Sequence, residues 1–234
     1  MEESHFVYKE GMFMAKLLYV TATPKTDSKL SKGMQLGEAF LDAFKQEQPD
    51  VEITHMHLYD MDIPVIDMDM LYARAKLSFM GKKMEDLSEG ERKQVTDMHA
   101  LADRFIDNDY YVFVSPIWNL GSPAILKAFM DNLFIAGKTF DPDPGNRHGL
   151  LTGRKAIHLQ TRGGVYSEGP LKDFNFGDQY LTTALRFLGM EVLPTVYAEG
   201  VDHFPKEVPA IMAAAKERAA EAAREMARGM VTVE

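Results

Sequence analysis

The sequence has 234 residues and contains no cysteine. This absence excludes thiolate nucleophiles, redox disulfides and cysteine-ligated zinc, and it gives no sign of a disulfide-dependent secreted domain. No apolar run approaches the ~20 residues that a membrane-spanning helix needs. The first 14 residues carry mixed charge without an apolar centre, so they do not have the pattern of a signal peptide. These absences favour a cytoplasmic protein that neither spans nor binds a membrane.

Several motifs that identify other classes of protein are also missing. The chain has no G-x-G-x-x-G, no G-x-x-x-x-G-K-[ST] and no G-x-S-x-G, which argues against a Rossmann site, a P-loop and a Ser-His-Asp hydrolase. Its histidines form no H-E-x-x-H and its acidic residues show no EF-hand spacing, so we predict no metal site. The net charge of −9 argues against nucleic acid as a partner. An anionic cofactor needs only local donors and is not excluded.

The hydrophobic content of 46% is sufficient for a real core, and the length fits one domain. Apolar periodicity predicts strands at 16–21, 51–58, 110–115, 155–160 and 191–198, and helices at 31–46, 88–107, 123–136, 176–188 and 206–229. The Met- and Asp-rich segment 59–84 is predicted to be irregular, and 138–153 to be a loop. We expect a mobile N-terminal extension at 1–14 and a single domain at 15–234.

Strands that alternate with helices predict an α/β fold, in which helices cover both faces of a parallel sheet. Five strands favour the flavodoxin-like, doubly wound order 2-1-3-4-5 over the six-stranded dinucleotide fold. In such a sheet ligands bind outside the carboxyl ends of the strands. The loops that follow strands are therefore the first places to look for a site.

The most informative of these loops lies within VFVSPIWNLGSPAILKAFMDNLF, residues 112–134. An apolar β run ends at Ser115-Pro116, the loop 117–121 follows, and Pro123 starts an amphipathic helix. Trp118 offers a π face, and Asn119 with its neighbouring backbone offers donors and acceptors. These groups suit a flat ring with polar edges, such as a flavin. The alternative for a lone tryptophan is a core or interface aromatic.

Two further loops have features of a ligand site. The first is crowded with hydroxyls, since Thr21, Thr23, Thr26, Ser28 and Ser31 precede a helix whose free amides and dipole attract phosphate. Ordinary N-capping is its alternative explanation. The second is the segment 161–164 (TRGG), in which paired glycines let the backbone approach a ligand and an arginine offsets charge on a reduced ring. A strand-ending turn is the alternative there. Because the three loops follow strands one, three and four, we expect one shared cleft.

Five segments together resemble the FMN-dependent azoreductases, which are flavodoxin-like NAD(P)H:quinone oxidoreductases of bacteria. The segments are KLLYVTATP, LSKGMQLGEAF, VSPIWNLGSPAILKAFMD, AGKTF and QTRGGVYSEGP. The most specific parts are Pro116-x-Trp118-Asn119 followed by Lys127, and Arg162-Gly163-Gly164-x-Tyr166-Ser167-x-Gly169-Pro170. The resemblance runs from about residue 16 to the C-terminus.

The resemblance implies a homodimer with one FMN per active site at the subunit interface. Hydride from NADH or NADPH would pass through FMN to a quinone or an aromatic azo compound in a ping-pong cycle, with no side chain acting as acid, base or nucleophile. The implied cofactor-binding residues are Thr23, Ser31, Gly33, Pro116, Ile117, Trp118, Asn119, Leu120, Thr161, Arg162, Gly163 and Gly164, and the implied substrate-pocket residues are Tyr166 and Phe187. Phe187 would come from the partner subunit.

The chain departs from the family where its phosphate turn often reads Ser-x-Ser. Here the segment is Ser31-Lys32-Gly33, so one hydroxyl is lost and only the Gly33 amide remains. Two other functions stay open at this point: a flavodoxin-type electron carrier and an NAD(P)H:FMN reductase. A flavodoxin would be smaller, and it would lack the segment 59–84 and the Ala-rich C-terminal helix.

Overall fold

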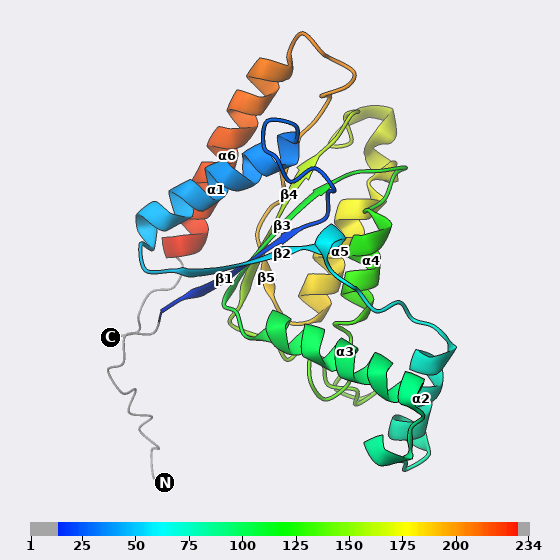
Figure 1. Cartoon of the computed structure of the whole chain (residues 1–234). Helices are drawn as coiled ribbons and strands as arrows, with labels where there is room; N and C mark the ends of the chain where they lie inside the picture. The colour runs from blue at the N-terminus through cyan, green and yellow to red at the C-terminus, as the bar shows by residue number, and fades with distance from the viewer. Residues whose placement is uncertain (1–13, 229–234) are drawn as a thin grey trace.

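The computed structural model describes residues 14–228, so most of the predicted N-terminal extension and the last residue of the predicted C-terminal helix lie outside the described residues. Its centre is a parallel sheet with the strand order β2-β1-β3-β4-β5 (Figure 1). The principal strands are β1 (Lys16–Thr21), β2 (Glu52–His57), β3 (Tyr110–Pro116) and β4 (Lys155–Thr161). The predicted fold class and strand order are confirmed.

The predicted fifth strand is two short strands. β5 (Glu191–Val192) and β6 (Val196–Ala198) both pair with β4 in parallel. The residues between them include Pro194, which has no N–H to donate to a ladder of backbone hydrogen bonds. The single strand predicted at 191–198 is therefore wrong in its middle, and right in its place at the edge of the sheet.

Helices cover both faces of the sheet. The helices α1 (Lys32–Glu47) and α6 (Val208–Arg228) lie side by side on one face, and α3 (Glu89–Ile106), α4 (Ala124–Asp131) and α5 (Phe176–Phe187) cover the other (Figure 1). Alternate residues of β1 point into the two resulting cores: Leu18 and Val20 into one, Leu17 and Tyr19 into the other. The short 3₁₀ turns are Leu58–Asp60, Met84–Asp86 and Gly169–Phe174. None of the helices within residues 14–228 is both long and apolar enough to cross a membrane.

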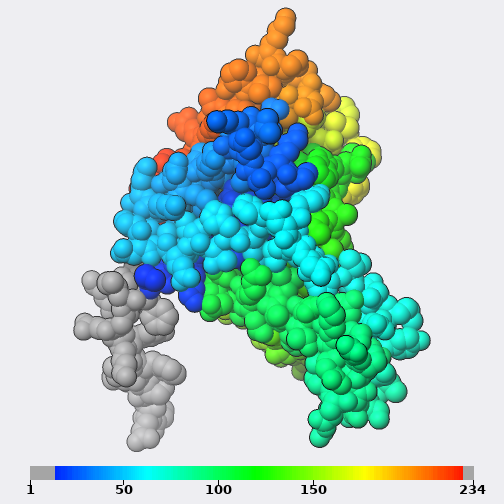
Figure 2. Space-filling view, viewed as in Figure 1, coloured from blue at the N-terminus to red at the C-terminus, as the bar shows by residue number. Residues whose placement is uncertain are grey.

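The segment predicted to be irregular contains a helix, α2 (Met68–Phe79). Asp67 caps its N-terminus by accepting a hydrogen bond from the Met70 amide at 2.9 Å. Only Met70 and Ala73 of this helix are buried, because α2 packs mainly on α3 and stands out from the body of the molecule (Figures 1 and 2). A narrow buried stripe leaves a weak apolar periodicity, which is why the sequence did not reveal this helix.

Candidate functional site

The carboxyl ends of β1, β3 and β4 meet at one edge of the sheet and enclose a cleft of about 190 Å³. Backbone hydrogen bonds bring the ends together: the Ala22 amide donates to Val114 O, and the Ile117 amide to Thr161 O, both at 2.9 Å. The lining residues come from all three predicted loops. Among them are Thr23, Ser31, Gly33, Pro116, Ile117, Trp118, Thr161, Arg162 and Gly163. The three loops thus share one cleft, as we expected.

The other predicted site residues do not line this cleft. Asn119 and Leu120 form the tip of a turn, and Gly164 packs against His203, Leu171 and Tyr166. Phe187 lies at the end of α5, where its ring stacks on Phe134 with centroids 5.6 Å apart. The predicted site residues that do not line the cleft are thus Asn119, Leu120, Gly164, Tyr166 and Phe187.

Sequence reasoning missed four polar residues that line the cleft: Lys25, Lys32, Ser115 and Asp202. The lysines lie within and just after the hydroxyl-rich loop, where an anion site was already predicted. Asp202 comes from the segment after β6, whose backbone folds over the TRGG loop: the amides of Asp202 and His203 both donate to Gly163 O at 3.1 Å. The one sequence signal that could have indicated this segment is its position directly after the last strand, where loops of such sheets can reach a ligand.

The N-terminus of α1 has the groups that an anion requires. Ser31 is its N-cap, a buried residue whose hydroxyl accepts a hydrogen bond from the Met34 amide at 3.3 Å. The first intrahelical bond starts at the Gln35 amide, so the amides of Lys32 and Gly33 have no partner within the helix. A Cβ at Gly33 would lie 3.2 Å from Val114 Cγ1, within the wall of the cleft. Free amides and a helix dipole beside the cleft suit a phosphate group.

The loop after β3 is a tight two-residue turn. Trp118 and Gly121 exchange two backbone hydrogen bonds of 2.9 Å, and Asn119 and Leu120 between them have φ angles of +48° and +70°. Two successive positive φ angles are characteristic of a type I′ turn, which leucine rarely enters. Strain of this kind concentrates at functional sites, where the surrounding structure imposes it. Here the Phe176 amide at the start of α5 donates to Leu120 O at 3.1 Å and supports the turn.

Trp118 is not a core residue, because 43% of it is exposed. Its ring meets that of Tyr59 edge-on, with centroids 6.4 Å apart, and it lines the cleft. The alternative of a core tryptophan is therefore wrong. The turn presents an aromatic face and backbone polar groups at the mouth of the site.

Arg162, whose charge was predicted to offset that of a reduced ring, has a counter-ion within the protein. Arg162 lines the cleft, but its side chain is fully buried and paired with Glu199, at 2.6 Å between Nη1 and Oε1. Burial of a cation demands a compensating anion, and Glu199, the residue after β6, supplies it from a position 37 residues further along the chain. No local pattern in the TRGG segment predicts that Glu199 is its partner.

Behind the cleft lies a second buried polar group. Ser115 Oγ is 2.8 Å from His158 Nε2, and His158 Nδ1 is 2.8 Å from Asp178 Oδ1. Burial alone would raise the pKa of Asp178, but hydrogen bonds from His158, Thr195 and Tyr197 hold that pKa well below its usual range. The order of groups is that of a hydrolase triad, yet Ser115 and His158 are almost completely buried. Ser115 lines the cleft with only 1% of its surface exposed, and we assign its hydroxyl no nucleophilic role.

Comparison with known proteins shows to which family the chain belongs. A family model described as the flavodoxin-like fold matches residues 15–223. Over 206 residues the chain is 41% identical to an FMN-dependent NADH:quinone oxidoreductase of Macrococcus caseolyticus, with 88% of this chain and 97% of that protein covered. The chain belongs to this flavodoxin-like oxidoreductase family. Another member, FMN-dependent NADH:quinone oxidoreductase 2 of Listeria innocua, is 38% identical over 212 residues, with 91% and 100% covered.

Solved structures of the flavodoxin-like oxidoreductase family superpose closely on this one. An azoreductase from Bacillus anthracis str. Sterne has a TM-score of 0.83 at 34% identity, with 91% of this chain and 100% of that chain covered. An FMN-dependent NADH-azoreductase from Bacillus anthracis str. Ames Ancestor, solved in complex with FMN, has a TM-score of 0.82 at 30% identity, with 91% and 99% covered.

Proposed function

We propose that this protein is an FMN-dependent oxidoreductase that transfers hydride from NADH or NADPH to quinones and aromatic azo compounds. The observation that carries the proposal is the single cleft that joins the α1 N-terminus, the strained Trp118 turn and the TRGG segment. Family members of known name support the same cofactor and donor, since they are FMN-dependent NADH:quinone oxidoreductases.

The donors in the cleft fit FMN. Ser31 and the amides of Lys32 and Gly33 would hold the phosphate, and Thr23, Lys25 and Lys32 would surround it with further donors and positive charge. Pro116, Ile117 and Trp118, with Asn119 and Leu120 at the tip of the turn, would hold one side of the ring system. Thr161, Gly163 and Gly164 would supply backbone groups to its other edge. FMN, when bound, supplies the hydride chemistry, and the protein binds it, orients it and limits access to it.

We assign no catalytic acid, base or nucleophile. The Ser115–His158–Asp178 group is almost completely buried, and we propose that the chain contributes chiefly orientation. Tyr166 and Phe187 stay proposed substrate-pocket residues. We also propose a cytoplasmic location, with which a sequence that contains no cysteine agrees.

The experiment is an anaerobic stopped-flow titration of the purified holoprotein with NADH or NADPH, followed by a quinone. We expect a yellow protein whose flavin absorbance is lost with the nicotinamide and returns with the quinone. A protein that neither contains nor binds FMN would end the proposal. Flavin that NADH cannot reduce would indicate a flavodoxin, and FMN that is released after each reduction would indicate an FMN reductase.

We also propose a homodimer, which an apolar strip on α5 supports. Phe176, Tyr180 and Phe187 lie on one side of this helix, and they line a cavity of about 480 Å³ together with Phe134. Phe176 and Phe187 are 53% and 40% exposed. The cleft itself, at about 190 Å³, is smaller than the roughly 300–1,000 Å³ of ordinary ligand sites. A second copy on the α5 strip would both cover these rings and complete the site.

The dimer predicts a specific effect of charge on the α5 strip. Phe187→Asp is expected to convert a dimer into a monomer in sedimentation velocity, because the carboxylate would have to be buried in an apolar contact. Phe79→Asp is the control, since Phe79 is 88% exposed on α2. A monomeric wild-type protein would contradict the dimer, and dissociation by Phe79→Asp alone would move the interface to α2.

The phosphate site predicts a difference between two N-cap substitutions. Ser31→Ala and Ser88→Ala each remove a serine that caps a helix, and each is expected to cost about 1 kcal/mol of unfolding free energy. Only Ser31→Ala is expected to weaken FMN, by about tenfold, while leaving riboflavin affinity unchanged. Fluorescence titration of the apoprotein with both flavins measures this. Equal loss of FMN and riboflavin affinity would contradict a phosphate contact at Ser31.

A further inference from the structure

The side chain of Arg162 is held from four directions. Its Nε donates to Gln160 Oε1 at 2.7 Å, Nη2 donates to Asn175 Oδ1 at 3.0 Å, and Nη1 pairs with Glu199 Oε1 at 2.6 Å. The guanidinium carbon also lies 3.4 Å from the centroid of the Tyr197 ring. So fully engaged a guanidinium has one orientation, and the backbone of residue 162 is constrained with it.

Glu199 accepts hydrogen bonds from both ends of the segment 162–166. The same Oε1 that accepts from Arg162 also accepts from the Tyr166 amide at 2.8 Å. Burial alone would raise the pKa of Glu199, but hydrogen bonds from Ser167, Arg162 and the Tyr166 amide outweigh it and keep the pKa below its ordinary value. One ionised carboxylate thus closes a loop around Gly163 and Gly164.

The backbone of this loop is fastened to the segment after β6 in a consistent direction. The Val201 amide donates to Arg162 O, those of Asp202 and His203 to Gly163 O, and that of Gly200 to Gly164 O, at 3.0 to 3.2 Å. In each of these bonds the loop contributes a carbonyl. None of them uses the amide of Gly163 or Gly164, so both N–H groups are left to other acceptors.

Stability of the fold alone does not explain why Arg162 and Glu199 form a buried ion pair. A buried pair seldom stabilises more than well-packed apolar side chains would, because both charges lose their hydration. A role in specifying one conformation explains it better, and the position of the pair directly behind the cleft loop agrees with that role. We propose that Arg162 and Glu199 are positioning residues, which hold the backbone of 161–166 in the conformation that binds the edge of the FMN ring. This inference rests on the proposed function.

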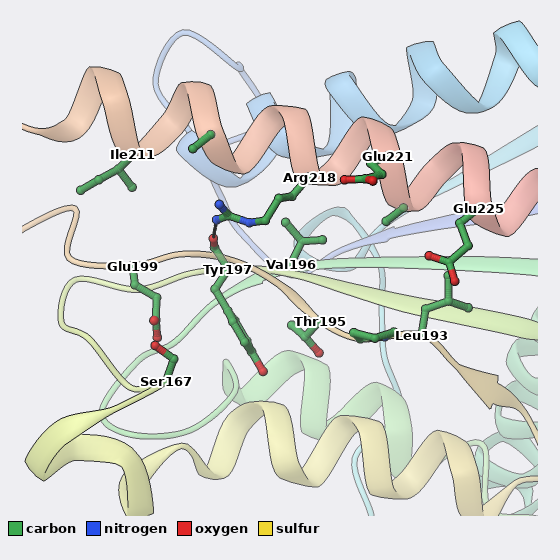
Figure 3. Close-up of a pocket in the computed structure, with 13 residues that line it drawn as sticks. Ser167, Leu193, Thr195, Val196, Tyr197, Glu199, Ile211, Arg218, Glu221 and Glu225 are labelled. Carbon is green, nitrogen blue, oxygen red and sulfur yellow. Dashed lines mark hydrogen bonds between the residues drawn. The ribbon is translucent and has the colours of Figure 1, made fainter.

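Tyr197 extends the same support to the loop after β3. Figure 3 shows Tyr197 and Glu199 extending away from α6, on which Arg218 donates to the Tyr197 carbonyl at 2.8 Å. The Tyr197 hydroxyl donates to Asp178 Oδ2 at 2.7 Å, and Asp178 contacts the His158–Ser115 pair. Ser115 directly precedes Pro116 and the Trp118 turn. The two loops proposed to hold the ring are therefore supported by one connected network.

The test compares Arg162→Lys and Glu199→Gln with Arg154→Lys. Arg154 is the control, because its guanidinium also donates to protein oxygens, Ile106 O and Asn108 O, but from a half-buried position at the opposite end of β4. Each variant is titrated as apoprotein with FMN, the midpoint potential of the bound FMN is measured, and thermal unfolding is recorded. We expect the first two to raise the FMN Kd by about tenfold or more and to shift the potential. Arg154→Lys is expected to lower Tm without either effect.

A wild-type protein that does not bind FMN would refute the proposed function itself. A wild-type protein that binds FMN, with folded Arg162→Lys and Glu199→Gln variants of unchanged Kd and potential, would refute only the positioning role. Tyr197→Phe keeps the test decisive if the ion-pair variants do not fold. It retains the ring under Arg162 and removes the bond to Asp178, so a Kd raised by about threefold supports the network and an unchanged Kd overturns it.

Discussion

A Gly177→Ala protein is expected to lose most of its affinity for FMN. Gly177 lies in the first turn of α5, where a Cβ would be 2.8 Å from both the carbonyl carbon of Gly121 and the amide nitrogen of Ser122. These are backbone atoms, so no side-chain rotation relieves the overlap. The loop that carries Trp118 must move away from α5, and a shift of about 1 Å at a binding site can reduce activity by roughly a hundredfold. We expect an FMN Kd raised by that order, measured by fluorescence titration of the apoprotein.

Gly121→Ala is the matched control for this prediction. A Cβ at Gly121 would meet only the carbonyl oxygen of Trp118, at 3.9 Å, which is an ordinary contact. The two substitutions add the same methyl group on opposite sides of one contact, and only Gly177→Ala should weaken FMN. If Gly177→Ala binds FMN as the wild type does, the close approach of α5 does not position the loop.

A Gly149→Ala substitution is expected to cause the largest loss of stability. A Cβ there would overlap the carbonyl carbon of Leu188 and the amide nitrogen of Gly189, just after the end of α5. This close approach is reinforced by the Leu151 amide, which donates to Leu188 O at 2.9 Å. Overpacking against backbone is among the costly core changes, so we expect a loss of about 3 kcal/mol of unfolding free energy. Denaturant unfolding measures it.

Gly145→Ala serves as the control for this loss. It lies in the same loop, and its Cβ would meet only Asp143 Oδ1, at 3.6 Å. We expect its unfolding free energy to stay within about 0.5 kcal/mol of the wild type. Equal stability of the Gly149→Ala and Gly145→Ala proteins would show that the loop does not pack on α5 in solution.

Much of the architecture could be predicted because its signals are local. Ser88 and Glu91 form the capping box that starts α3, and the buried strand β3 begins with the apolar run Tyr110–Val114. Local signals did not predict the structure where a helix buries few residues or where a single residue interrupts a strand. Helix α2 buries too few residues to show its period, and Pro194 divides the last strand.

The candidate site divides in the same way. Its three loops were predictable, because hydroxyls before a helix, an aromatic turn and paired glycines are each visible in a few consecutive residues. Their meeting in one cleft followed from the topology of a doubly wound sheet. Asp202 was missed, since it reaches the cleft only through a segment that folds back over Gly163.

Local patterns in the sequence were enough to predict the alternation of strands and helices, the strand order through the count of elements, and the three loops that follow β1, β3 and β4. Only the tertiary structure decided which way the polar side chains of those loops point. Arg162 turns into the interior because Tyr197 on β6 and Glu199 just after it lie beside it, although both are far along the chain. A buried charge takes the orientation of its partner, and that partner is chosen by the pairing of strands, which no local pattern records.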